Sequence, residues 1–349
     1  MLWEGWILNW ARVYRSHECE RVTTTRSRSW LRTYPRSEIY SHGRAYMEHV
    51  MQSPSTLLFT SPLLKIGHFC CPIQHPHFQD TGPIVSGHLI VFPRTSVYIH
   101  HPGAPPVVAD PNLVLFYNLH QTYQRASLSA EGDRCEWYAF APDLLLNALQ
   151  EYEPQVVDQP ERPFAFTHAP SLPRLYLRQR QVFEHIRQSP HPDVLYVEET
   201  MLLTLAMLLA HVYQYRRREQ RRSRPTTDQQ QHAIVQAIQA ELTTRFHEKL
   251  LLKELADQVY LSPYELCRIF RRHTGYTIHQ YLNQRRLCTA LESVTMPSAD
   301  LTDVALTLGY NSHSHFTSAF RKAFGVTPRA LRADVTAITQ SVRGTAPRW

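Results

Sequence analysis

The chain has 349 residues, of which 43% are hydrophobic and 19% are charged. This composition excludes a chain that is disordered throughout and predicts two or three folded domains. The net charge of +7 favours an anionic partner, of which nucleic acid is the commonest.

Cysteine spacing and hydropathy indicate the compartment. The six cysteines show no spacing typical of a disulfide framework, so we expect reduced thiols. The longest apolar run, Met201 to Val212, is shorter than the roughly 20 residues that span a bilayer. No signal peptide is recognised at the N-terminus. These features together predict a cytoplasmic protein.

Residues 1–55 differ from the rest of the chain. Arg, Ser and Thr are scattered without a period, for example between Thr23 and Ser29. This pattern predicts a disordered N-terminal extension. An alternative is that the natural protein starts at Met47 or Met51.

Residues 56–170 contain short apolar runs separated by Pro, Gly and Asp. β-branched and aromatic residues recur at intervals of roughly ten residues, a pattern that is typical of an all-β sandwich or small barrel. The runs that we expect to be strands are Leu57–Phe59, Gly87–Pro93, Ser96–Ile99, Val107–Pro111, Leu113–Tyr117 and Trp137–Phe140.

Residues 171–224 change to helical periodicity, with helices expected over 175–188 and 193–222. In the second helix Leu202, Leu205, Leu209 and Val212 fall on one face. This region is a linker or dimerisation region, since the apolar face suits either packing within the chain or a homodimer seam. A polar stretch with a proline, residues 223–228, follows and predicts a linker.

Two segments near the C-terminus follow one plan of a short helix, a tight turn and a second helix. The first covers residues 251–273 and the second covers residues 301–324. Ser262 and Ser312 stand where each second helix needs an N-cap, and Ala256 and Ala305 let the paired helices cross closely. A connecting helix over 278–287 would hold the two units so that each enters a successive major groove, about 34 Å apart.

Residues 232–334 resemble the DNA-binding domain of the AraC/XylS family of bacterial regulators. The resemblance rests on Leu255-Ala256, Ser262, Leu266, Arg268, Phe270-Arg271, Gly275, Tyr281-Leu282, Arg286-Leu287, Ala290-Leu291, Val304-Ala305, Gly309-Tyr310, Phe316, Phe320-Arg321, Phe324-Gly325 and Thr327-Pro328. Two positions depart from it. Ser318 replaces a common Arg of the second recognition helix, and Leu331 replaces a common aromatic residue.

The resemblance implies a multidomain α+β protein. An N-terminal all-β, cupin-like sensory barrel precedes the helical region. The C-terminal all-α domain has two helix-turn-helix units joined by a connecting helix, followed by a tail over 335–349. The motifs of the β region that resemble family members are Phe92-Pro93-Arg94, Val108-Ala109-Asp110-Pro111-Asn112 and Gly132-Asp133-Arg134-Cys135.

The recognition helices supply the expected DNA contacts. Arg268 suits a bidentate contact with guanine, and Arg271 and Arg272 suit phosphate. The other candidates are Ser262, Tyr264 and Cys267 in the first unit and Ser312, His313, Ser314, Thr317, Ser318 and Arg321 in the second. The alternative is that Arg271, Arg272, Arg321 and Lys322 form a solvated surface.

A metal site in the β region is a weaker hypothesis. Cys70, His75, His77 and Cys135 would hold Zn²⁺ if their strands met, whereas free cysteines also pack as small hydrophobic side chains. The Glu that follows His-x-His in metal-binding cupins is absent. We therefore expect no cofactor and no enzymatic activity.

The leading hypothesis is a transcription activator or repressor that responds to a small-molecule effector. Its partners would be double-stranded promoter DNA, RNA polymerase and a second copy of the chain. One alternative is a cupin-type metal enzyme fused to a DNA-binding module. Another is a constitutive DNA-binding protein whose β domain only dimerises.

Overall fold

The computed structural model describes residues 54–220, 228–296 and 298–333. The N-terminal extension up to residue 53, the linker up to residue 227 and the tail from residue 334 lie outside the described residues.

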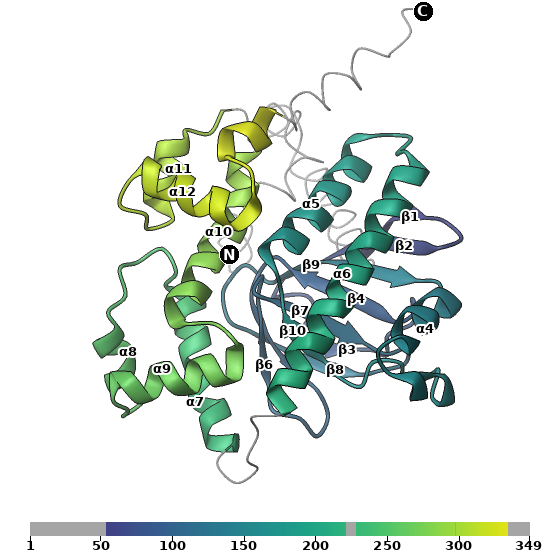
Figure 1. The fold of residues 1–349 in the computed structure, drawn as a ribbon, viewed down its shortest axis with the longest axis horizontal. Helices are drawn as coiled ribbons and strands as arrows, with labels where there is room; N and C mark the ends of the chain where they lie inside the picture. Colours follow the sequence, from purple (N-terminus) through teal and green to yellow (C-terminus); the bar gives the residue numbers. More distant parts are fainter. Residues whose placement is uncertain (1–53, 221–227, 297, 334–349) are drawn as a thin grey trace, which may run out of the picture. The chain divides into compact units, whose positions relative to one another are not determined.

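Two antiparallel sheets form the first half of the described chain (Figure 1). The six-stranded sheet has the order β1-β2-β9-β4-β7-β10, and the four-stranded sheet has the order β3-β8-β5-β6. The strands are β1 (Ser55–Thr60), β2 (Leu64–Cys71), β3 (Asp80–Thr81), β4 (Leu89–Pro93), β5 (Val97–His100), β6 (Val107–Ala109), β7 (Leu113–Tyr117), β8 (Tyr123–Ser127), β9 (Asp133–Phe140) and β10 (His168–Pro170).

The central strands β4 and β7 are buried on both faces. Phe92 and Phe116 face a core shared with the helices, whereas Val91 and Leu115 face the smaller sheet. A strand buried on both faces has no polar positions to alternate with apolar ones, which explains the irregular sequence pattern. The expected runs are confirmed as parts of β1, β4, β5, β6, β7 and β9. Strands β2, β3, β8 and β10 complete the sheets and were not predicted.

Helices cover one face of the six-stranded sheet. The expected helices over 175–188 and 193–222 are confirmed as α5 (Pro173–Gln188) and α6 (Val194–Gln220), which lie side by side (Figure 1). Helix α4 (Pro142–Gln150) and the 3₁₀ helix η2 (Pro154–Asp158) connect β9 to β10, which leads into α5.

Helix α6 is more apolar than the sequence pattern suggested. Among the described residues, its Val194–Arg218 part is long and apolar enough to cross a membrane by length and composition. This differs from the expectation drawn from Met201–Val212, because few charged residues interrupt the helix before Arg216. Met201, Leu205 and Leu209 are buried against the rest of the fold, as in a core helix.

The C-terminal half is helical, as expected. The two helix-turn-helix pairs are α8 (Leu252–Gln258) with α9 (Pro263–Thr274), and α11 (Leu301–Thr307) with α12 (His313–Phe324). The connecting helix α10 (Ile278–Val294) extends beyond its expected end. Helix α7 (Asp228–Thr244) precedes them and packs on α9.

The second helix-turn-helix unit shares a core with the β domain. Leu205 of α6 and Leu291 of α10 belong to one buried cluster, which also contains Phe320 of α12 and Leu331. Helix α5 contacts both α10 and α12. The helical C-terminal half is therefore packed against the β domain and its helices.

Phe116 tests the core beneath these helices. Its ring is fully buried, with ring centroids 5.2 Å from Phe164 and 4.8 Å from Phe166. We expect Phe116→Ala to lower the free energy of unfolding by about 3–5 kcal/mol, because it removes the ring and leaves a cavity. Urea unfolding followed by circular dichroism measures this change. Val85→Ala, at a side chain that is 75% exposed, is the control and should change stability by less than about 0.5 kcal/mol.

Candidate nucleic-acid interface

The first helix-turn-helix unit turns tightly between α8 and α9. Ala256 is fully buried, which allows the two helices to approach closely. The backbone N–H of Leu261 donates to the Ala256 carbonyl over 3.0 Å. Tyr260, in the turn, has a positive φ of 56° and is 95% exposed.

The second unit repeats this turn. Ala305 is fully buried, and the N–H of Tyr310 donates to its carbonyl over 3.0 Å. Gly309, with a φ of 78°, occupies the place of Tyr260. Two segments with little sequence identity therefore adopt the same backbone plan.

The N-caps of both recognition helices are confirmed. The Ser262 hydroxyl oxygen accepts from the Glu265 N–H over 3.2 Å, while the Glu265 carboxylate accepts from the Ser262 N–H and hydroxyl. This is a reciprocal capping box, and these bonds lower the pKa of Glu265. In the second unit the Ser312 hydroxyl accepts from the His315 N–H over 3.2 Å.

The ends of the same helices are also defined. Gly275 follows α9 and Gly325 follows α12, with φ of 77° and 83°. A left-handed residue after a helix suits glycine, which has no Cβ to clash. Each recognition helix thus starts and ends at a residue recognisable from the sequence.

The predicted contact residues lie on the outer faces of the recognition helices. Tyr264 is 77% exposed, and Cys267, Arg268 and Arg271 are exposed beside it. The predicted contact residues of the second unit that are exposed are Ser312, His313, Ser314, Ser318 and Arg321.

Four predicted contacts are less available to DNA than the others. Arg272 and Thr317 are half-buried, so they lie at the edges of the exposed faces. The hydroxyls of Ser262 and Ser312 accept backbone N–H groups as caps, so each has less capacity for a phosphate. Leu331, the position that departs from the family pattern, is buried in the shared core.

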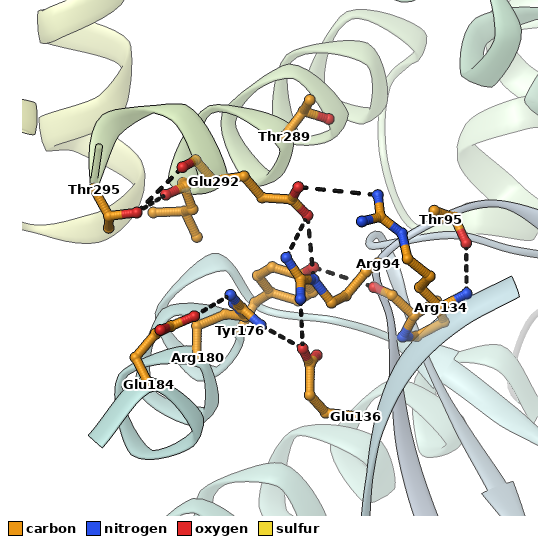
Figure 2. Close-up of polar contacts among 12 residues, drawn as sticks. Arg94, Thr95, Arg134, Glu136, Tyr176, Arg180, Glu184, Thr289, Glu292 and Thr295 are labelled. Carbon is orange, nitrogen blue, oxygen red and sulfur yellow. Dashed lines mark hydrogen bonds and ion pairs between the residues drawn. The ribbon is translucent and has the colours of Figure 1, made fainter. Parts of the chain in front are cut away.

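Charged residues join the β domain to helix α10 (Figure 2). Arg94, which follows β4, makes an ion pair of 2.7 Å with Glu292 of α10 and also contacts Glu136 of β9 over 3.4 Å. Arg180 of α5 contacts Glu136 and binds Glu184 over 2.8 Å. This network joins the β domain to α10. A movement of α10 would therefore change the ion pair between Glu292 and Arg94, which also contacts Glu136 of β9.

A buried carboxylate makes a second connection. The Asp110 carboxylate accepts hydrogen bonds from the hydroxyls of Tyr281 (2.7 Å) and Thr243 (3.0 Å), which belong to the helical C-terminal half. Burial raises the pKa of Asp110, while Arg285 and these hydrogen bonds oppose the shift. The Ser171 carbonyl also accepts from the Tyr276 hydroxyl and the Gln284 amide.

The sequence contained a signal for this interface that its interpretation did not use. Three β-region motifs resemble family members, and each supplies a contact described here: Arg94, Asp110 and Arg134, whose guanidinium lies 4.0 Å from Glu292. Their partners Glu292 and Tyr281 are far away in the sequence. The sequence motifs therefore identified the residues of the β domain at this interface but not their partners on α10.

The cysteine and histidine candidates of the β domain are not brought together as a set. Cys70 pairs with Arg134 and Cys71 with Asp133, so Cys70 points to the opposite face of the sheet from Cys135. Burial raises the pKa of the Cys71 thiol to about 11 and raises that of the Cys135 thiol well above its ordinary value, which disfavours thiolates. Within the described ranges, no group of three or more His, Cys, Asp or Glu side chains suits a metal ion.

Comparison with known proteins identifies the C-terminal region. Residues 255–334 match the family model of a helix-turn-helix domain. A segment of 148 residues is 30% identical to the HTH-type transcriptional activator RhaS of Pectobacterium atrosepticum, covering 42% of this chain and 50% of that protein. Another of 88 residues is 31% identical to the regulatory protein PocR of Salmonella typhimurium, covering 25% of this chain and 29% of that protein.

A solved structure also matches this region. The DNA-binding domain of AdpA, a global transcriptional factor in complex with a target DNA, is 27% identical, with a TM-score of 0.27. It covers 31% of this chain and 93% of that chain. The chain spans half or less of the length of the two relatives named above.

These matches define a DNA-binding domain of the helix-turn-helix class in the C-terminal region. The matched residues lie within 232–334, the segment whose sequence resembles the DNA-binding domain of the AraC/XylS family. RhaS is a transcriptional activator and PocR is a regulatory protein.

The two serine caps offer a matched comparison. We expect Ser262→Ala to lower the free energy of unfolding by about 1–2 kcal/mol and Ser312→Ala by less, because only Ser262 has the reciprocal carboxylate. Ser262→Thr keeps the hydroxyl and is the control. Urea unfolding of the three variants measures the difference, and equal losses at the two caps would contradict the role of Glu265.

The same capping box predicts a pH dependence. The folded-state pKa of Glu265 is lowered, so its contribution is present above the ordinary value of 4.5 and is lost as the pH falls through the folded value. The stability difference between wild type and Ser262→Ala should therefore shrink when the pH is lowered below 4.5. A difference that grows in acid would contradict this assignment.

Proposed function

We propose that the chain is a sequence-specific DNA-binding regulator of bacterial transcription, which places α9 and α12 in two successive major grooves about 34 Å apart. One observation carries this proposal. Two backbone units of the same plan present exposed recognition helices and are held by a single connecting helix, α10.

The residues suggest different roles for the two recognition helices. Arg268 has the length and the planar donors for a bidentate contact with guanine, and Arg271 suits a phosphate. On α12 the exposed His313, Ser314 and Ser318 are short and polar, so bases would be read there directly or through water. We therefore propose that α9 supplies the stronger base contact.

The β domain would act as a cupin-like sensory domain over residues 56–170, with the helical region over 171–224 and the DNA-binding domain over 232–334. Its contacts with α10 through Arg94 and Asp110 offer a route by which a small-molecule effector would alter DNA binding. An effector acts only if it binds two states of the sensor differently. The similarity to RhaS, a transcriptional activator, supports activation as the mode of regulation. We further propose RNA polymerase as a partner and the bacterial cytoplasm as the compartment.

The alternatives make different predictions. A cupin metal enzyme needs a group of metal ligands, and the described part of the chain offers no observation in its favour. A constitutive DNA-binding protein would show no ligand-dependent thermal shift, whereas a ligand-responsive one would be stabilised by its effector.

A homodimer through α6 is our proposal for the oligomeric state. The outer face of α6 exposes Leu195 (73%), Leu203 (53%) and Met207 (43%), at helical spacing. Glu199 is exposed towards one end of this face, and Arg218 is exposed at the other. An antiparallel pair of α6 helices would bury the apolar centre and bring each acidic end to the partner's basic end.

Arg268→Ala tests the proposed function. Full-length wild type is first used to select a site from a random DNA pool, and that site is then titrated with both proteins. We expect the substitution to weaken binding by about 1–3 kcal/mol and to relax the preference for one guanine. Arg162→Ala, at an exposed arginine of the β domain, removes the same charge and should change affinity little. Binding that ignores both sequence and Arg268 would reject the proposal.

A double substitution tests the α6 surface. Wild type should sediment at equilibrium with twice the chain mass of 40.7 kDa. Leu203→Glu with Met207→Glu should shift it to the monomer, because four carboxylates would be buried in the pair. Val157→Glu, at an exposed apolar side chain elsewhere, is the control. A monomeric wild type, or a dimer unaffected by the double substitution, would refute this surface.

A further inference from the structure

One side chain links the segment that leads into the first helix-turn-helix unit to the turn of the second. Arg286 lies on the connecting helix α10, and its guanidinium donates three hydrogen bonds to backbone carbonyls. Two of these, to Phe246 (2.5 Å) and Glu248 (2.8 Å), reach the segment between α7 and α8, directly before the first unit. The third, to Gly309 (3.0 Å), reaches the turn of the second unit.

Gly309 shows how closely these parts pack. A Cβ at this position would lie 2.6 Å from the His247 carbonyl oxygen and 2.8 Å from Nη2 of Arg286. Its φ of 78° is also one that side chains disfavour. The turn of the second unit therefore lies directly against both Arg286 and the segment that precedes α8.

The contact continues into the second unit and into the segment that precedes the first. Tyr310, next to Gly309, lies 5.8 Å from the Arg286 guanidinium, and its hydroxyl donates to Asn283 of α10 over 2.8 Å. The Tyr310 ring packs on Phe316, on the buried face of recognition helix α12, with centroids 5.3 Å apart. On the other side, the guanidinium of Arg285 lies 4.9 Å from the Phe246 ring.

The two units otherwise have separate cores. Leu255, Leu266 and Phe270 of the first unit belong to one buried cluster, whereas Phe316 and Phe320 of the second belong to another. Helix α10 contributes to both clusters. The relative position of the recognition helices thus depends on α10 and on the contacts at the seam around Arg286.

We propose that Arg286 is a positioning residue that sets the separation of α9 and α12, and thereby the spacing of the two DNA elements that the protein accepts. Only arginine offers planar donors in several directions at once, so lysine cannot hold both units. This inference rests on the proposed function, since it concerns how two recognition helices read one site.

The physical reason is the effective concentration of the second unit. When α9 is bound, a rigid link holds α12 at the next groove, and the second contact costs little additional entropy. A loosened link spreads α12 over more positions. Affinity at the correct spacing then falls, while sites with other spacings lose less.

The test uses the full chain and the site selected by wild type. Duplexes carry both elements at the natural spacing, both elements moved apart or together by one or two base pairs, or the first element alone. We expect Arg286→Lys to weaken binding at the natural spacing by about tenfold. We also expect it to bind the first element alone within about twofold of wild type and to show a flatter dependence on spacing.

Two further variants separate positioning from folding. In Gly309→Ala the added Cβ would clash with the Arg286 guanidinium, so this variant should flatten the dependence of binding on spacing in the same way. It provides an independent test if Arg286→Lys fails to fold. Cys288→Ala, at a buried position of α10 away from these hydrogen bonds, should lower the melting temperature but keep the wild-type spacing dependence.

The outcomes are distinct. An Arg286→Lys protein that loses the same factor on every duplex, with an unchanged spacing profile, would overturn the inference and leave the DNA-binding function standing. A wild type that selects no two-element site would instead reject the proposed function itself.

Discussion

Burial of helix α10 on several sides is the constraint on which the arrangement of the DNA-binding half depends. Tyr281 of this helix is buried in the first helix-turn-helix unit, Leu291 in the second, and Glu292 pairs with the β domain. A helix held from three directions has little freedom to rotate. Its position therefore determines where each recognition helix is presented and how the β domain contacts both.

The interface between the halves combines apolar and charged contacts. The apolar cluster supplies most of the burial, whereas Asp110 and Glu292 supply contacts whose loss would leave buried charges or hydroxyls without partners. Such polar contacts contribute modestly to the free energy that holds the two halves together. They favour one arrangement of the halves over others. This suits a regulator in which an effector alters the packing of the halves, as our proposal requires.

Local features of this fold could be predicted from the sequence, and long-range ones could not. The caps at Ser262 and Ser312, the buried alanines and the turns depend on neighbouring residues, so both helix-turn-helix units were recognisable. Strand β2 pairs with β9, about seventy residues away, and its register decides that Cys70 and Cys135 face apart. The pairing of Arg94 with Glu292 depends on the tertiary fold and leaves no local pattern.

Hydroxyl-radical footprinting of the full chain on its selected site tests the central claim most directly. The account predicts two protected windows on one face of the duplex, separated by about one helical turn of 10–10.5 base pairs. A single protected window, or uniform protection along the duplex, would contradict the claim that two recognition helices, held by α10, read successive grooves.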